Sequence, residues 1–133
     1  MTNHENQVDR IHKLTNLWIY EVTINKDPWS VYNLFCKNAT LLGTVSQTLR
    51  TGHRIKEYFD YFAKLPKLEV LNKKYNITKV NDLVYINTAF VTWTWEGLPK
   101  PIVARMTFTY NDNCIIQLHS SMLPKVNKAL RYQ

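Results

Sequence analysis

The sequence predicts an α+β fold, in which helices near the N-terminus pack on one face of a curved antiparallel sheet. Two observations carry this prediction: apolar residues recur at helical spacing up to about residue 65, and strand patterns follow from about residue 68. The chain has 133 residues, of which 45% are hydrophobic and only 3 are glycine, so it is long enough to bury a core. We therefore expect one domain over residues 1–133, with its core at about 4–124 and a basic tail at 125–133.

The first helix is predicted over about residues 4–25. Ile11, Leu14, Trp18 and Val22 follow one another at spacings of three and four, which places them on one face of a helix. This face is the one that we expect to bury against the sheet.

Two further helices are predicted from their start and stop signals. Asp27 is a favourable N-cap and Pro28 suits the first helical position, so a short helix is expected to run to about Phe35. A third helix is expected to follow Gly52 and to end before Pro66, which cannot continue it.

Alternating and β-branched residues predict the strands. A short strand is expected at about residues 38–44, and longer strands at about 68–77, 83–95, 102–110 and 114–121. Asn111, Asp112 and Asn113 would form the tight turn between the last two strands.

The charge of the chain constrains its partners. The net charge is +7, but the lysines are dispersed along the chain rather than grouped in a block. This dispersion favours a solvated basic surface, and we expect no nucleic-acid partner. No apolar run approaches the length of a membrane span, so we expect no membrane partner either.

Two cysteines, Cys36 and Cys114, stand far apart, and no Cys/His spacing resembles a zinc site. The first residues contain no apolar signal segment. We therefore expect a cytoplasmic, reducing setting in which both thiols are free, with no metal and no cofactor.

The last two strands carry the candidate ligand-binding residues. If a three-residue loop pairs Tyr110 with Cys114, then Arg105 lies opposite His119 and Thr107 lies opposite Gln117. Ser121 belongs to the same mixed face, whereas the other face of the hairpin is almost entirely apolar.

Two assignments of these faces are open. In the first, the mixed face lines a pocket beneath the helices and the apolar face is a dimer interface. In the second, the helices cover the apolar face, and Arg105 and His119 are solvated. A two-residue loop would undo the predicted pairing, because a slip of one residue moves side chains to the other face.

Five segments stand in a characteristic order: Asp27-Pro28, residues 41–46 with 49–51, residues 55–62, residues 104–110 and residues 119–124. Together they resemble the nuclear transport factor 2-like (cystatin-like) superfamily. More narrowly, they are similar to the bacterial SgcJ/EcaC-like branch related to the association domain of calcium/calmodulin-dependent protein kinase II. The chain departs from the pattern at two places: Asn113 stands where the family often has tryptophan, and Leu118 stands where it has the first of two histidines.

The resemblance implies a cone-shaped curved antiparallel sheet packed against three N-terminal helices, with a pocket between helices and sheet. It also implies a homodimer formed through the sheet. It does not imply one reaction, because relatives include binding modules, assembly domains, isomerases, cyclases and dehydratases.

The leading hypothesis is a homodimeric domain that binds a small polar or anionic organic ligand. Arg105 would anchor the anion, because its planar fork suits a carboxylate. The remaining ligand-binding candidates are His119, Gln117, Ser121, Thr107 and Trp18, although core packing is the alternative role for Trp18.

Two alternatives are kept. One is a SnoaL-like or ketosteroid-isomerase-like enzyme with His119 as the candidate catalytic base, although no aspartate stands where such a mechanism needs one. The other is an assembly or interaction module without a ligand.

Overall fold

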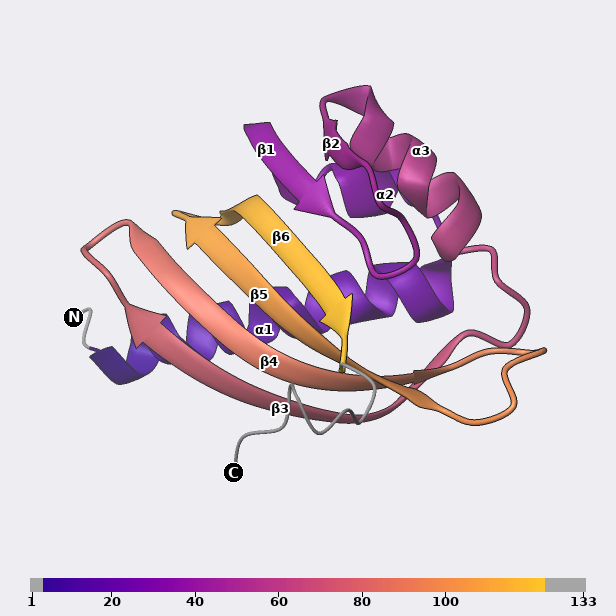
Figure 1. The fold of residues 1–133 in the computed structure, drawn as a ribbon. Helices are drawn as coiled ribbons and strands as arrows, with labels where there is room; N and C mark the ends of the chain where they lie inside the picture. The colour runs from indigo at the N-terminus through magenta and orange to yellow at the C-terminus, as the bar shows by residue number, and fades with distance from the viewer. Residues whose placement is uncertain (1–3, 124–133) are drawn as a thin grey trace, which may run out of the picture.

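The computed structural model describes residues 4–123, and Figure 1 shows its helices and strands. The helices are α1 (His4–Tyr20), the π-helical η1 (Glu21–Asn25), α2 (Pro28–Tyr32) and α3 (His53–Phe62). The strands are β1 (Phe35–Leu42), β2 (Leu49–Thr51), β3 (Glu69–Lys79), β4 (Val84–Thr94), β5 (Ile102–Asn111) and β6 (Cys114–Met122). The tail expected over residues 125–133 lies outside the described residues.

The strands form one curved sheet in the order β2-β1-β6-β5-β4-β3. Neighbouring strands pair antiparallel, except β1 and β6, which pair parallel. The sheet is therefore mixed, whereas the sequence predicted a purely antiparallel one. The α+β class and the order of the longer elements are as predicted. The short strand β2 was not anticipated, because three residues carry too little pattern.

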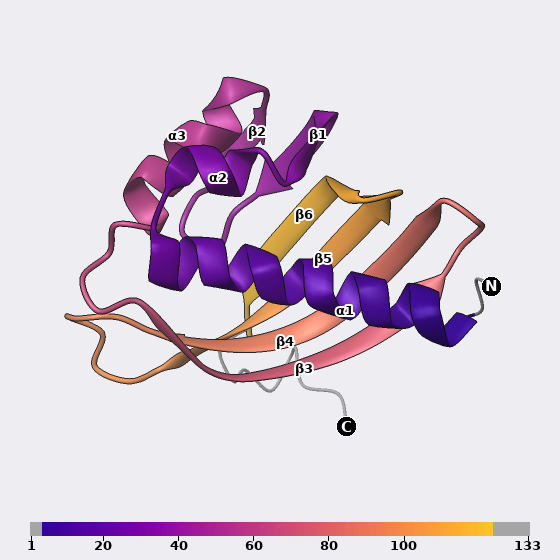
Figure 2. The same ribbon diagram turned by 180° about the vertical axis from the view of Figure 1, so that it is seen from behind.

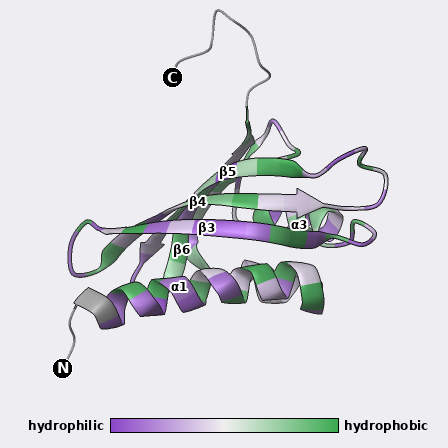
Figure 3. Cartoon of the chain, turned by 90° about the horizontal axis from the view of Figure 1, so that it is seen from below, coloured by the Kyte–Doolittle hydropathy of each residue, from purple (hydrophilic) through white to green (hydrophobic). Residues whose placement is uncertain are grey.

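The predicted first helix is confirmed as α1 followed directly by η1. It ends at Lys26, which adopts a left-handed conformation (φ 55°) and donates its backbone N–H to the carbonyl of Glu21 at 2.8 Å. The predicted inward face is buried, with Ile11 and Val22 fully shielded from solvent. In Figure 2 this helix lies across one face of β3–β6, and Figure 3 shows it as a layer beside the sheet.

The second helix begins as predicted. Asp27 accepts hydrogen bonds from the backbone N–H of Trp29 and the hydroxyl of Ser30, both at 3.0 Å. The helix ends at Tyr32 rather than Phe35, because Phe35 is already the first residue of β1.

The apolar face of the β5–β6 hairpin is the covered one. Ala104, Met106, Phe108, Ile115 and Leu118 are at most 2% exposed and belong to one core with residues of α1 and α3. The second of the two assignments therefore describes the chain: the helices cover the apolar face, and the mixed face lies on the other side of the sheet.

The two cysteines are joined. Cys36, at the start of β1, forms a disulfide with Cys114, at the start of β6, and their Cα atoms are 5.0 Å apart. The prediction of free thiols is wrong, because the parallel pairing of β1 with β6 brings together residues that are 78 positions apart. The expectation of a reducing setting rested on free thiols and is no longer supported by them. The cytoplasmic location stays a prediction.

Within residues 4–123, no helix combines the length and the apolar character needed to cross a membrane.

Candidate functional site

The turn between β5 and β6 sets the position of every candidate side chain. Asn111 pairs with Cys114, so the loop contains two residues, and Asp112 takes the left-handed conformation that such a turn needs (φ 56°). Tyr110 then pairs with Ile115, but Thr109 pairs with Gln117. The intervening Ile116 is therefore an extra residue, and β6 contains a β-bulge.

The predicted cross-strand pairs are wrong, because the register differs from the predicted one by two residues of β6. Arg105 lies opposite Ser121, and Thr107 lies opposite His119. The shorter loop and the bulge each move the register by one residue. Because the two shifts add to two residues, the candidate side chains return to a common face, and Arg105 and His119 are diagonal neighbours.

This common face is opposite the one on which α1 lies (Figure 2). No helix of residues 4–123 packs on it, and we call it the uncovered face. Arg105, His119 and Gln117 are exposed there, and Thr107 and Ser121 are half-buried. The residues between them in sequence point to the core, so the alternation is that of strands with one solvated face.

A depression of about 530 Å³ opens on the uncovered face. It brings together four of the six predicted ligand-binding residues: Arg105, Thr107, His119 and Ser121. Its other lining residues come from β3, β4 and β5: Lys74, Tyr75, Asn76, Thr88, Ala89, Phe90 and Met106.

The remaining two candidates lie elsewhere. Gln117 is on the same face but pairs with Thr109 and is not part of the lining. Trp18 is 2% exposed and packs edge-on against Trp93 and Phe108 in the core. The packing role therefore describes Trp18 better than a ligand contact.

Two rows of side chains cross the depression at right angles to the strands. One row is Lys74, Phe90, Arg105 and Ser121, and the next is Asn76, Thr88, Thr107 and His119. Sequence reasoning missed Lys74 and Phe90. Alternation within a strand gives the face of each residue, whereas its neighbours in a row depend on the register between strands.

Among the described residues, those that line the depression include cations and no carboxylate. Asp and Glu are absent from both rows, and within residues 4–123 Arg105, Lys74 and His119 form no ion pair or hydrogen bond. The ion pairs between described residues lie elsewhere: Lys13–Asp9, Lys56–Asp60, Lys67–Glu96 and Lys79–Asp82. Arginine and lysine donors with no protein acceptor are suited to an anion from solution.

The space between α3 and the central strands of the sheet is nearly filled. A void of about 10 Å³ lies beside Trp18, Tyr58, Trp93 and Ser120, which is room for about one water molecule. Tyr58 lines it from the side of α3, and the backbone N–H of Val45 donates to the Tyr58 hydroxyl at 3.4 Å. This part of the interior therefore has no room for an organic ligand, although the resemblance implied a pocket between helices and sheet.

The lining of this interior void offers little acid–base chemistry. It consists of aromatic, aliphatic and hydroxyl residues, and no described aspartate, glutamate or histidine reaches it. The hydroxyls of Thr44 and Ser120 hydrogen-bond to each other. Burial raises the pKa of Tyr58 to about 12, so this phenol stays protonated at neutral pH.

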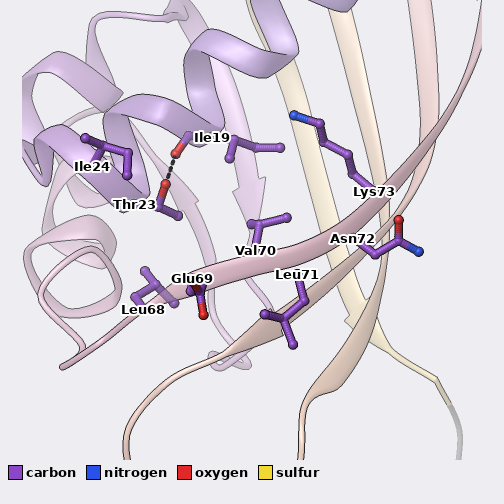
Figure 4. A pocket seen from close by; sticks show the side chains of 9 residues that line it. All are labelled: Ile19, Thr23, Ile24, Leu68, Glu69, Val70, Leu71, Asn72 and Lys73. Carbon is purple, nitrogen blue, oxygen red and sulfur yellow. Dashed lines mark hydrogen bonds between the residues drawn. The ribbon is translucent and has the colours of Figure 1, made fainter.

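A second hollow, of about 620 Å³, lies between η1 and the edge strand β3 (Figure 4). Its lining mixes apolar residues, among them Ile19, Leu68 and Val70, with polar ones. The Thr23 hydroxyl donates to the carbonyl of Ile19 at 2.8 Å. Lys73 lines this hollow, whereas its neighbour Lys74 lines the depression on the other face. The side chains of these adjacent lysines of β3 thus lie on opposite sides of the sheet.

The described residues, 4–123, contain no group of three histidine, cysteine or acidic side chains placed to hold a metal ion.

Solved structures share this fold. A putative calcium/calmodulin-dependent protein kinase II association domain from Xanthomonas campestris is 26% identical over 87% of each chain, with a TM-score of 0.75. A putative dehydratase of the nuclear transport factor 2-like family from Streptomyces avermitilis is 9% identical over 91% of this chain and 99% of its own, with a TM-score of 0.77. A nuclear transport factor 2-like protein from Anabaena variabilis is 14% identical over 94% of this chain and 96% of its own, with a TM-score of 0.68.

No protein-family model and no curated protein sequence matches the chain. The three structural neighbours nevertheless cover 87%, 91% and 94% of this chain, with TM-scores of 0.75, 0.77 and 0.68. The chain has the fold of the nuclear transport factor 2-like superfamily, as the resemblance of its five segments predicted.

Proposed function

We propose that this protein binds a small anionic organic ligand in the depression on the uncovered face, with Arg105 as the anchor. One observation carries the proposal: Arg105, Lys74 and His119 open into one hollow of about 530 Å³ that contains no described carboxylate. The guanidinium has no partner among residues 4–123, so its donors are available to an incoming acid.

The neighbouring side chains suit this ligand. A guanidinium binds a carboxylate through two parallel hydrogen bonds, and the Ser121 and Thr107 hydroxyls and the His119 ring can donate to further oxygens. The net charge of +7 would also raise the rate at which anions reach the surface. Gln117 lies at the margin of the proposed site.

Isothermal titration calorimetry with benzoate, citrate and inorganic phosphate tests the proposal. At least one of these anions should bind, and Arg105→Ala should weaken that binding at least about tenfold, the effect of one lost charged hydrogen-bonding partner. Arg54→Ala removes an exposed arginine on α3 and is the matched control, because it leaves the depression intact. Equal affinities for wild type and Arg105→Ala would refute the proposal.

Assembly through the same face is a second candidate function. The similarity to an association domain at 26% identity favours it, and the Phe90 side chain is 48% exposed on the open sheet. A homodimer should give a light-scattering mass of twice the 15.8 kDa of one chain. A monomer at all protein concentrations would remove this candidate, whereas a dimer that dissociates on ligand addition would show that ligand and second copy compete for the face.

Catalysis by His119 has less support. This side chain is exposed, and no carboxylate of the described residues contacts it to orient the ring. The enzymatic alternative stays a prediction, which would fail if a turnover found for this protein were unchanged in His119→Ala.

A further inference from the structure

We infer that the depression selects a flat aromatic dianion, whose ring lies on Phe90 and whose two acidic groups reach Lys74 on one side and Arg105 on the other. This inference rests on the proposed function and adds the class of ligand. It follows from the order of side chains across the sheet rather than from any one residue.

The register of three strands fixes that order. Lys74 of β3 pairs with Phe90 of β4, and Phe90 pairs with Arg105 of β5. The aromatic ring therefore stands between two cations in a row at right angles to the strands. Adjacent strands are about 4.8 Å apart, so the Cα atoms of Lys74 and Arg105 are separated by about 10 Å.

The three side chains are available to a ligand. All of them line the same depression, and the Phe90 side chain is 48% exposed. Neither Lys74 nor Arg105 has an ion-pair or hydrogen-bond partner within residues 4–123. A flat ring can stack on an exposed phenyl group in an offset arrangement, which an aliphatic ring of the same size cannot.

The balance of charge favours two acidic groups. In the adjoining row Asn76, Thr88 and Thr107 are neutral and His119 is the one titratable side chain. No carboxylate of the described chain lies in either row, so Lys74 and Arg105 are the two permanent cations. A monoanion would leave one of the two cations without a counter-charge, whereas a dianion with its acids at opposite ends of a ring would neutralise both. Ser121, beyond Arg105, can donate to the acid held there.

Three probe molecules separate the parts of the inference. Terephthalate has a flat ring and two opposed carboxylates, benzoate has the ring and one carboxylate, and trans-cyclohexane-1,4-dicarboxylate has two carboxylates without the aromatic ring. By calorimetry, terephthalate should bind the wild-type chain at least about tenfold more tightly than benzoate, since it gains the second ion pair. It should also bind more tightly than the cyclohexane acid.

Adjacent lysines supply a matched pair of variants. Lys74→Met should weaken terephthalate binding about tenfold and leave benzoate binding unchanged, because benzoate uses Arg105 alone. Lys73→Met removes the same charge from the next residue of β3, which lines the hollow on the other side of the sheet, and should change neither affinity.

The outcomes distinguish this inference from the proposed function. Equal affinities for the three probes, or equal effects of Lys73→Met and Lys74→Met, would overturn the inference. The proposed function would survive that result if Arg105→Ala still weakened binding at least about tenfold. Failure of every probe and of citrate and phosphate to bind wild type would overturn both.

Discussion

At the scale of single residues, Arg105 depends on the alternation of β5. Its sequence neighbours Ala104 and Met106 are buried in the core, so Arg105 must project from the other face of the sheet. This much follows from the sequence, and it is why four predicted residues meet in the depression. Lys74 and Phe90 could not be found in that way. Their position beside Arg105 depends on the register of β3 and β4, which alternation within a strand does not give.

Gly43 is a second residue whose role depends on its surroundings. It is buried directly after β1, and a Cβ atom at this position would collide with the ring of Tyr58. The tyrosine ring in turn stacks on Phe62 of α3. The absence of a side chain at residue 43 is therefore what allows Tyr58 to close the interior void.

Gly43→Ala should lower the free energy of unfolding by about 1–3 kcal/mol, because overpacking forces neighbouring side chains from their favoured positions. Urea denaturation measures this loss. In a Tyr58→Leu background the same substitution should cost close to nothing, because the colliding ring is gone. An equal cost in both backgrounds would show that the collision is not the cause.

At the scale of elements, the β5–β6 hairpin shows where prediction from sequence ends. Both strands and the common face of Arg105 and His119 were predicted, yet the partners were wrong. The loop has two residues instead of three, and Ile116 forms a β-bulge that the residue types around it do not indicate. Registers of this kind depend on packing of the whole sheet against its helices.

The pairing of β1 with β6 is a second feature that could not be predicted from the sequence. These strands pair at Phe35–Ile115 and again at Thr40–Gln117, with an irregular stretch between. The disulfide of Cys36 and Cys114 lies at the start of this contact and closes a loop of 78 residues. It therefore holds β1, and the segment that follows, against the rest of the sheet.

Replacing both Cys36 and Cys114 by serine should lower the free energy of unfolding by about 2–4 kcal/mol, since the unfolded chain regains the freedom that the long loop denied it. Urea denaturation of the variant and of the reduced wild-type chain should give matching losses. Addition of reductant to the serine variant is the control and should change nothing. Unchanged stability in both comparisons would contradict the stabilising role of the crosslink.

At the scale of the whole molecule, the sheet separates two environments. On one side the helices and the sheet enclose an aromatic core with almost no free space, and on the other the cationic depression is open. The sequence predicted this division into an apolar and a mixed face. The resemblance placed the pocket on the covered side. There the space among Trp18, Tyr58 and Trp93 is only about 10 Å³, and the larger hollow lies at the edge of the sheet, between η1 and β3.

The buried tyrosines make stability depend on alkaline pH. Burial raises the pKa of Tyr58 from 10.0 to about 12 and also raises the pKa values of Tyr75 and Tyr110. A raised pKa in the folded state means that the folded chain holds these protons more tightly than the unfolded chain. Their contribution to stability is thus complete below about pH 10 and is lost as pH rises through about 12.

Urea denaturation at pH 9 and pH 11 should therefore show a lower free energy of unfolding at the higher pH. Tyr58→Phe, which cannot ionise, should make the decrease smaller. Tyr61→Phe is the matched control, since this side chain is 61% exposed, and should leave the decrease as in wild type. A decrease that Tyr58→Phe leaves untouched would assign the effect to other groups.

A crystal structure of the chain with terephthalate tests the central claim most directly. We expect one carboxylate within hydrogen-bonding distance of the Arg105 guanidinium, in the depression of the uncovered face. Density for the ligand in the interior beside Trp18, with the Arg105 side chain directed into bulk water, would contradict it.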